Sequence, residues 1–310
     1  MQLEATIEPQ SENKADDVMS DQSSQGQLSI RNASKVFASL SGEGEVCVFE
    51  DVSLEIANGE FMSIIGHSGC GKSTLLNILA GFDTPTTGEV LVDGKPIKGP
   101  GLDRMVVFQS FALMPWMSAF DNVRVAVRSA FPSWDKSQVA AHTSRYLQLM
   151  GLGDIGKKMP AHLSGGMRQR VGLARAFAVQ PKALMLDEPF AQIDALTRGS
   201  IQDELVRMWD KAGATVCMVT HDVDEAILLS DRIALMTNGP NARVAEIIEV
   251  DIPRPRTREQ LIESEAYMRL RARILRFLID HNRRPSQYDD TMHVIQAYDT
   301  QDGDVASSPD

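Results

Sequence analysis

Short apolar runs alternate with longer segments of helical periodicity through the middle of the chain. Three runs are almost wholly apolar and end in polar turns, as expected of strands buried on both faces of a sheet: Phe61–Ile65, Ala183–Asp187 and Thr215–Thr220. Arg104–Gln109 predicts a fourth strand. This alternation predicts an α/β fold in which helices flank a parallel sheet.

The helical segments differ in length and in the signals at their ends. Ser73–Ala80 predicts a helix that ends at Gly81, a residue that suits a helix C-cap. Residues from about 120 to 178 are predicted to be mostly helical, with a break at Phe131–Pro132–Ser133. Arg258–His281 predicts an amphipathic helical stretch whose apolar side carries Leu261, Tyr267, Leu270, Ile274 and Leu278.

The two ends of the chain have a different composition from the middle. Residues 1–27 are rich in Gln, Ser, Asp and Glu, and residues 285–310 are similarly polar and acidic. Such segments bury too little apolar surface to fold, so we expect both to be disordered tails. No internal repeat is found, which predicts a single copy of the functional machinery.

Charge and cysteine content narrow the class of function. The formal net charge of −11 argues against a broad nucleic-acid surface, which needs clustered positive charge, but allows a local phosphate pocket. Three cysteines without metal-site spacing indicate free thiols in a reducing compartment. The longest apolar runs are too short to span a bilayer and the N-terminus has no secretory pattern, so we expect a cytosolic protein.

One glycine-rich segment carries the strongest chemical signal. Gly66-His-Ser-Gly-Cys-Gly-Lys72-Ser73 fits the P-loop pattern and lies between a predicted strand and a predicted helix. Glycines let backbone N–H groups turn inward around phosphate oxygens, Lys72 adds a positive charge, and the hydroxyl of Ser73 suits Mg²⁺. The candidate nucleotide-binding residues are Gly66, His67, Ser68, Gly69, Cys70, Gly71, Lys72, Ser73 and Thr74. Cys70 is interpreted as a small spacer rather than a redox group.

Polar residues follow two other predicted strands. Asp187 and Glu188 end an apolar strand, where Asp187 suits a Mg²⁺ shell and Glu188 a general base beside the attacking water. Many strands end in Asp-Glu, so the pair gains weight only from the upstream P-loop. His221 ends Thr215–Thr220 and precedes Asp222, a plausible helix N-cap. A lone histidine at a strand end is usually structural.

A second glycine-rich helix start follows the first by about ninety residues. In Leu163-Ser-Gly-Gly-Met-Arg-Gln-Arg170, Ser164 can cap a helix while Gly165 and Gly166 expose its N–H groups. The segment is therefore a candidate second anion site. Glycines at helix starts are common, so the residues alone leave a structural role equally open.

Taken together, these motifs resemble those of the ATP-binding cassette family, over about residues 28–250. The P-loop, the Q-loop at Gln109, the signature at Leu163–Arg170, the Walker B segment Ala183–Glu188 and the switch histidine His221 follow the family's order. Phe37 is similar to the adenine-stacking aromatic residue, although it lies further from the P-loop than usual and a core role is the alternative. The D-loop keeps Asp194, but Ala191 and Gln192 depart from the family's Ser-Ala and leave their role open.

The resemblance implies the fold and the roles. It implies a RecA-like P-loop core, an antiparallel β-subdomain, an inserted helical subdomain at about 110–173 and a C-terminal helical extension at 251–284. It implies ATP and Mg²⁺ as cofactors, with Ser73, Gln109 and Asp187 near the metal and Glu188, His221 and Gln109 in catalysis. The signature residues Ser164, Gly165, Gly166 and Gln169 are implied to meet the ATP of a second cassette, identical or not, packed head to tail.

The resemblance also implies partners. A cassette of this kind sits at the cytoplasmic face of the inner membrane, held by transmembrane permease subunits and served by a periplasmic or lipid-anchored substrate-binding protein. Met105–Trp116 resembles importers of nitrate, sulfonates, bicarbonate and cyanate, and Thr220–Pro240 looks most similar to the nitrate/nitrite branch. The segment after His221 is too short for the large regulatory domain of sugar importers, so none is expected.

Two other classes of function compete with a transport ATPase. Soluble cassette proteins of translation usually carry two cassettes, and those of DNA repair place a coiled coil between P-loop and signature. This chain has one cassette, and no heptad run separates Lys72 from Leu163. A binding module without activity would be expected to have lost the residues of hydrolysis, yet Lys72, Asp187, Glu188 and His221 are all present.

Overall fold

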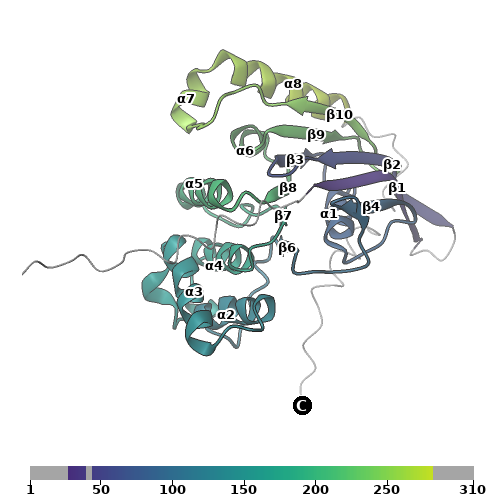
Figure 1. Ribbon diagram of the computed structural model, residues 1–310. Coiled ribbons are helices and arrows are strands. Elements are labelled where there is room, and N and C mark those ends of the chain that lie inside the picture. The colour runs from purple at the N-terminus through teal and green to yellow at the C-terminus, as the bar shows by residue number, and fades with distance from the viewer. Residues whose placement is uncertain (1–26, 40–43, 282–310) are drawn as a thin grey trace, which may run out of the picture.

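The computed structural model describes residues 27–39 and 44–281 and arranges them around two sheets (Figure 1). The larger sheet has the order β10-β9-β3-β8-β7-β6, in which only β10 runs antiparallel to its neighbour. Its strands are β3 (Phe61–Ile65), β6 (Arg104–Val107), β7 (Ala183–Asp187), β8 (Thr215–Thr220), β9 (Arg232–Met236) and β10 (Val244–Glu249). The predicted α/β class is confirmed.

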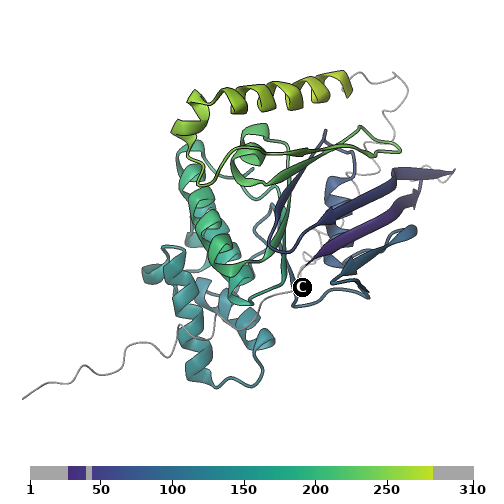
Figure 2. The ribbon, with the colours of Figure 1, turned by 45° about the horizontal axis from the view of Figure 1, so that its top comes forward.

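The smaller sheet is antiparallel, with the order β2-β1-β4-β5, and corresponds to the expected β-subdomain. Its strands are β1 (Leu28–Ala38), β2 (Glu45–Ile56), β4 (Thr87–Val92) and β5 (Lys95–Pro96). The α-helices are α1 (Lys72–Ala80), α2 (Ala119–Ala130), α3 (Lys136–Leu149), α4 (Gly165–Ala178), α5 (Ala195–Ala212), α6 (Val223–Leu229), α7 (Arg258–Glu263) and α8 (Glu265–His281). Two views place α8 on the opposite side of the molecule from α2 and α3 (Figures 1 and 2).

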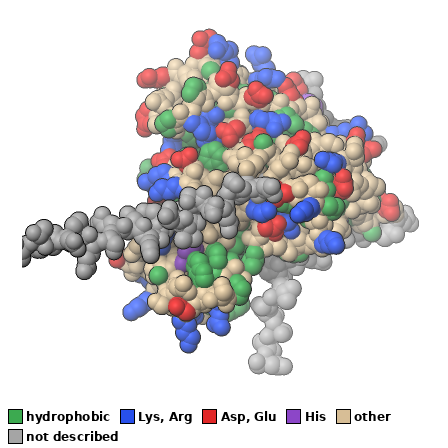
Figure 3. Space-filling view, in the orientation of Figure 1, with side chains coloured by type: hydrophobic (Ala, Val, Ile, Leu, Met, Phe, Trp, Pro, Cys, Tyr) green, Lys and Arg blue, Asp and Glu red, His purple; other side chains and the backbone are tan. Residues whose placement is uncertain are grey.

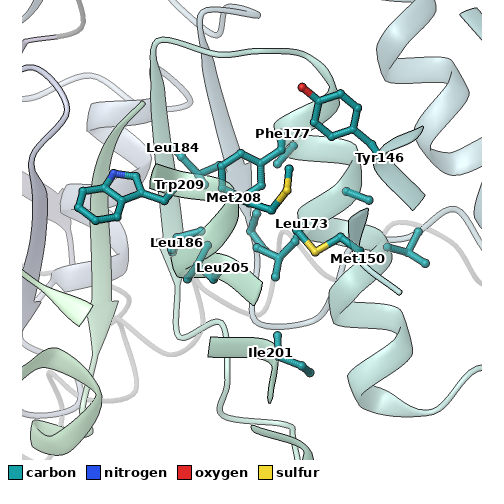
Figure 4. Close-up of a cluster of buried hydrophobic side chains, with 14 of the residues drawn as sticks. Tyr146, Met150, Leu173, Phe177, Leu184, Leu186, Ile201, Leu205, Met208 and Trp209 are labelled. Carbon is teal, nitrogen blue, oxygen red and sulfur yellow. The ribbon is translucent and has the colours of Figure 1, made fainter. Parts of the chain in front are cut away.

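The central strands β3, β7 and β8 of the larger sheet are buried on both faces, which explains their continuous apolar sequences. Along β7, Leu184 and Leu186 pack into the core beneath α4 and α5, whereas Met185 faces the core around α1 and the smaller sheet. Figure 4 shows Leu184 and Leu186 beside side chains of α3, α4 and α5. A strand enclosed in this way can move its terminal residues very little, so it is a rigid support for a site.

Most predicted elements are present, with differences at their ends. The three apolar runs are β3, β7 and β8, and Gly81 caps α1 in the left-handed conformation with a φ of 82°. The prediction that a strand reaches Gln109 was wrong, because β6 ends at Val107. A turn begins at Phe108, whose carbonyl accepts from Phe111 N at 3.2 Å and whose ring stacks on Phe82.

The helical predictions were right in outline. The break at residues 131–133 separates α2 from α3, but residues 150–164 form turns and short 3₁₀ segments rather than a helix. Glycines and a proline, including Gly151 with a φ of 66°, interrupt the helix there. The final amphipathic stretch is divided at Ser264, whose hydroxyl accepts from Tyr267 N and so starts α8 as a new helix.

The predicted tails at 1–27 and 285–310 lie outside the described residues, apart from Gln27. Within the described ranges, no helix is both long and apolar enough to cross a bilayer. The visible surface carries intermingled acidic and basic side chains over α7 and α8, at the top of Figure 3.

Candidate nucleotide site

The polar segments found in the sequence converge on one edge of the larger sheet. The chain passes from β3 into the P-loop, from β7 into Glu188, from β8 into His221, and from β6 toward Gln109. These four strands are adjacent and parallel, so their carboxyl ends lie at the same edge. In open α/β sheets, ligands bind in the crevice outside this edge.

Lys72 is held by the loop that precedes it. Its buried ammonium group donates to the carbonyl oxygens of Gly66 at 2.9 Å and His67 at 2.8 Å. The loop therefore already has a closed shape, with its positive charge inside. Burial raises the pKa of the neighbouring Cys70 thiol, which favours the protonated thiol and agrees with a spacer role.

Gly71 shows why the start of α1 needs a glycine. It has a φ of 92°, and a Cβ there would lie 2.5 Å from Cγ1 of Val48 on β2. Gly71 is the N-cap of α1 and offers no side-chain hydrogen bond to the helix. The first N–H groups of α1 are thus not satisfied by a cap from this residue, which is the condition that lets a helix N-terminus bind an anion.

Two oxygen ligands already meet beside the P-loop. The hydroxyl of Ser73 donates to Oδ1 of Asp187 at 3.0 Å, joining the first turn of α1 to the end of β7. A hydroxyl and a carboxylate side by side are donors of the kind that Mg²⁺ prefers, and this ion commonly keeps several waters and phosphate oxygens as its other ligands. The residues present therefore fit a magnesium ion that is shared with a nucleotide.

Glu188 and His221 form a second pair at the same edge. Nδ1 of His221 lies 3.2 Å from Oε1 of Glu188. Glu188 has a φ of 42°, an uncommon conformation for a residue with a Cβ, and its backbone N–H donates to the carbonyl of Val219 on β8 at 2.9 Å. The chain turns sharply after β7 in this conformation, which places the carboxylate beside His221 instead of continuing along the strand.

A buried polar network supports the segment that carries His221. Thr220 Oγ1 and Gln202 Nε2 donate to the carboxylate of Glu225, at 3.0 and 3.1 Å. Burial and the charge of Asp222 raise the pKa of Glu225 to about 7. Asp222 caps α6 by accepting from two backbone N–H groups, as its position predicted.

The signature segment begins α4 as predicted, with Ser164 as an exposed N-cap that accepts from Met167 N at 3.3 Å. Gly166 faces α5 so closely that a Cβ would lie 2.6 Å from Cγ2 of Thr197. Gln169, which we also expect near the partner's ATP, is 0 % exposed in the single chain, and its role in that site stays a prediction. Gln169 lies three residues after Gly166, on the helix face that packs inward.

Three predicted residues are not brought into contact with these groups among the described residues. Phe37 is partly buried on β1, where the ammonium of Lys35 lies 4.8 Å from its ring. Gln109 is exposed in the turn after β6. Asp194 is the N-cap of α5 and accepts from Thr197 N at 2.9 Å; that hydrogen bond lowers its carboxyl pKa.

One contact of the P-loop was not expected from the sequence. Nε2 of His67 lies 2.7 Å from the carbonyl oxygen of Leu278 in the last turn of α8. The two residues are 211 positions apart, and no local pattern pairs a loop residue with the backbone of a distant helix. The amphipathic pattern of the C-terminal stretch indicated that it packs somewhere, but not against which element.

Comparison with known proteins identifies the family of the chain. The sequence profile of the ABC transporter family matches residues 49–191. The chain is 49 % identical over 235 residues to the nitrate import ATP-binding protein NrtD of Synechococcus elongatus, covering 76 % of this chain and 86 % of that protein. The chain belongs to the ABC transporter family.

Other relatives differ in length and in the transported solute that their names specify. The cassette is 48 % identical to the nitrate transport protein NasD of Klebsiella oxytoca, covering 82 % of this chain and 96 % of that protein. It is also 48 % identical to the bicarbonate transport ATP-binding protein CmpC of Synechocystis, covering 83 % of this chain but spanning only 38 % of that relative's length. A solved dimer of the cassette MJ0796, bound to ADP and Pi, aligns with a TM-score of 0.66 at 30 % identity, covering 73 % of this chain and all of that one.

Proposed function

We propose that this protein hydrolyses ATP to drive the import of a small anion, most specifically nitrate or nitrite. The observation that carries the proposal is the meeting of Lys72, the Ser73–Asp187 pair and the Glu188–His221 pair at one sheet edge. The names of NrtD and NasD support the choice of nitrate, and the name of CmpC makes bicarbonate the second candidate. The anion is selected by other subunits, so the cassette supplies energy and not specificity.

The phosphates of ATP would lie in the P-loop, against the uncapped start of α1 and the charge of Lys72. His67, Ser68, Gly69, Cys70 and Thr74 complete the loop and the first helical turn, and Phe37 would contact the adenine. Ser73 and Asp187 would hold Mg²⁺, with Gln109 joining them if the turn after β6 closes. When bound, the ion neutralises charge on the β- and γ-phosphates.

Hydrolysis would then use the pair at the ends of β7 and β8. Glu188 accepts a proton from the attacking water as general base, and its fixed turn aims the carboxylate at that water. His221 lies 3.2 Å away, where it can orient Glu188 and contact the γ-phosphate. The buried network around Glu225 keeps the histidine segment in place.

A complete site would need a second cassette. Ser164, Gly165 and Gly166 begin a helix whose N-terminus is exposed, and in a head-to-tail dimer this end would meet the ATP of the partner. Asp194 would lie close to that interface. The dimeric MJ0796 cassette supports this arrangement.

A groove next to Gln109 suits the permease subunits. It has a volume of about 470 Å³ and is lined by β6, the turn after it and Arg175 of α4, together with residues that precede β6, among them exposed Phe82 and Leu102. Trp116, in the segment that follows, is 72 % exposed. Such an apolar surface is typical of a docking site. The cassette would thus be peripheral at the cytoplasmic face of the membrane, in a complex with a substrate-binding protein.

This proposal implies a division of the chain. Residues 28–250 would form the nucleotide-binding domain, with a helical subdomain at about 110–173 and a C-terminal extension at 251–284.

Uptake measurements test the function directly. The genomic copy would be replaced by Glu188→Gln in the source cells, and uptake of labelled nitrate and labelled bicarbonate would be compared with wild type. Loss of nitrate uptake alone supports the proposal, and loss of bicarbonate uptake alone assigns the second candidate. Unchanged uptake of both anions contradicts the importer role.

A further inference from the structure

The C-terminal helix α8 contacts both sides of the candidate catalytic site. Near its start, Tyr267 Oη and Arg271 Nε donate to the same oxygen of Asp224, Oδ1, at 2.8 and 2.7 Å. Near its end, the carbonyl of Leu278 accepts from Nε2 of His67 in the P-loop at 2.7 Å, because a carbonyl oxygen can only accept. Residues 267 and 278 are about 16 Å apart along a helix.

Asp224 stands close to the catalytic histidine along the chain. It is the second residue of α6, and its backbone N–H donates to the carboxylate of Asp222, which caps that helix. His221 directly precedes the cap. A displacement of Asp224 therefore shifts the first turn of α6. Through that turn it shifts the segment that holds His221 next to Glu188.

The C-terminal end of α8 is connected to Lys72 through a single residue, His67. The ring of His67 donates to Leu278, while the backbone carbonyl of His67 accepts from the ammonium of Lys72 at 2.8 Å. Asn238, in the turn after β9, also donates to the backbone carbonyl of His281 in the last turn of α8. The end of the helix is thus attached to the P-loop and to the strand end beside it.

The middle of α8 prevents the helix from moving freely. Ile274 is fully buried in a cluster with Val223, Ala226 and Ile227 of α6. The middle of the helix is therefore fixed by packing against α6, between its two polar ends. Burial, and then the hydrogen bond to Asp224, raise the pKa of Tyr267 to about 12, so its hydroxyl stays a donor throughout the physiological range.

We propose that α8 is a brace between the P-loop and the segment of His221, and that Tyr267 and Arg271 are positioning residues that act on His221 through Asp224. The brace keeps the group that binds phosphate and the group that orients the base at a fixed separation. It rests on the proposed ATPase function and adds a role for the C-terminal extension.

The sizes of the expected effects on stability and on catalytic rate distinguish this role from simple stabilisation. Asp224 and Arg271 keep side-chain exposures of 51 % and 42 %, and exposed ion pairs contribute little to stability. Their loss should leave the protein folded. Small displacements of catalytic groups, by contrast, change rates strongly.

The first experiment measures ATPase kinetics of the full chain with Tyr267→Phe and Arg271→Gln combined. We expect kcat to fall about three- to tenfold while KM for ATP stays within about twofold, because the P-loop contacts are intact. The matched control is Arg269→Gln, which removes an arginine from α8 whose ion pair, within the part of the chain that the structure describes, is with Glu265 of the same helix. Its kcat should equal that of wild type, and the Tm of both variants should change by less than about 4 °C.

The second experiment removes the contact between His67 and the C-terminal end of α8. His67→Ala should lower kcat and raise KM for ATP, and His67→Gln, which keeps a donor near the position of Nε2, should restore most of the kcat. When His67→Ala is added to the first double variant, kcat should fall little further, because a brace broken at one end no longer connects the two loops.

Two results would overturn the brace while leaving the ATPase function intact. One is a kcat of the Tyr267→Phe/Arg271→Gln variant equal to that of the Arg269→Gln control. The other is a combined His67→Ala/Tyr267→Phe/Arg271→Gln variant in which the fold-losses of kcat at the two ends multiply. That result would mean that the two ends of α8 make independent local contacts. Absence of hydrolysis by the wild-type chain would instead overturn the proposed function itself, and the brace with it.

Discussion

Two helices of this protein begin in glycine-rich loops, but their N-termini are prepared differently. The N-cap of α1 is Gly71, which offers no side chain to the helix, and the loop before it encloses the buried Lys72. The N-cap of α4 is Ser164, an exposed residue whose hydroxyl accepts from the backbone of Met167. The first helix start lacks a side-chain cap and is enclosed, and the second is capped and open.

This difference indicates what each helix start can do. A helix start without a side-chain cap, beside a held lysine, suits a phosphate site within one chain. A capped helix start on the surface is stable by itself and becomes a ligand contact only when another molecule brings an anion to it. We therefore expect capture of ATP to depend on α1, and closure of the dimer to depend on α4.

The largest effect is expected from Glu188→Gln, which leaves both helix starts intact. The amide keeps the shape of the side chain but cannot act as a base, so ATPase activity should fall by about 10²–10⁴. Nucleotide should still bind and hold the dimer closed. Phosphate release and size-exclusion chromatography with ATP measure the two results, and near-normal turnover would exclude Glu188 as the base.

Gly165→Asp in the Glu188→Gln background tests whether α4 meets a partner's nucleotide. Two like charges about 4 Å apart repel by on the order of 4 kcal/mol in a partly buried site, so dimerisation should weaken roughly a thousandfold. ATP affinity of the monomer should be retained. Gly165→Ala is the control for the added carbon without the charge, since its Cβ would lie in tight contact with Gln192 O at 3.1 Å and in ordinary contact with Phe111 at 3.9 Å. A stable dimer with Asp at this position would mean that α4 does not face the nucleotide.

Lys72→Ala tests whether the start of α1 captures ATP. Removing the charge inside the P-loop should weaken ATP binding by about tenfold or more, measured by titration calorimetry. The control is Lys182→Ala, which loses a lysine just before β7, at the opposite end of the strand from Asp187, where it pairs with Asp93. Equal ATP affinity in both variants would contradict the P-loop assignment.

The smallest effect is expected from Ser164→Ala. Loss of an N-cap costs roughly 1 kcal/mol of stability, and the exposed position should keep the effect near that value. Denaturant unfolding of the full chain measures it. ATP affinity of the monomer should not change, and a change there would show that α4 contributes to capture within one chain.

Sequence reasoning found the local features because each has a local cause. β3, β7 and β8 are almost wholly buried in the larger sheet, so their apolar runs mark them to the residue. Gly81, Asp222 and Ser164 act at helix ends as their side chains, or lack of one, predict. The burial of Gln169 could not be predicted in this way, because proximity in sequence to an exposed cap does not say which helix face a residue occupies.

Other features depended on contacts between distant segments. The end of β6 at Val107 follows from a turn that is stabilised by packing of Phe108 on Phe82. Gly166 is required by the approach of α5, and the left-handed Glu188 by a hydrogen bond to β8. None of these has a signature in the neighbouring residues.

The sequence by itself determined the chemistry available: a phosphate loop, two carboxylates after one strand, a histidine after another and a second glycine-rich helix start. Residue type and short spacing suffice for these, because each depends on backbone freedom or charge within a few positions. Only the tertiary structure decided which groups meet. The parallel sheet brings Ser73 to Asp187 and Glu188 to His221, and the seating of Ile274 brings α8 against His67 and Asp224. Such contacts join residues far apart in the chain, so they arise from the packing of whole elements and not from any local pattern.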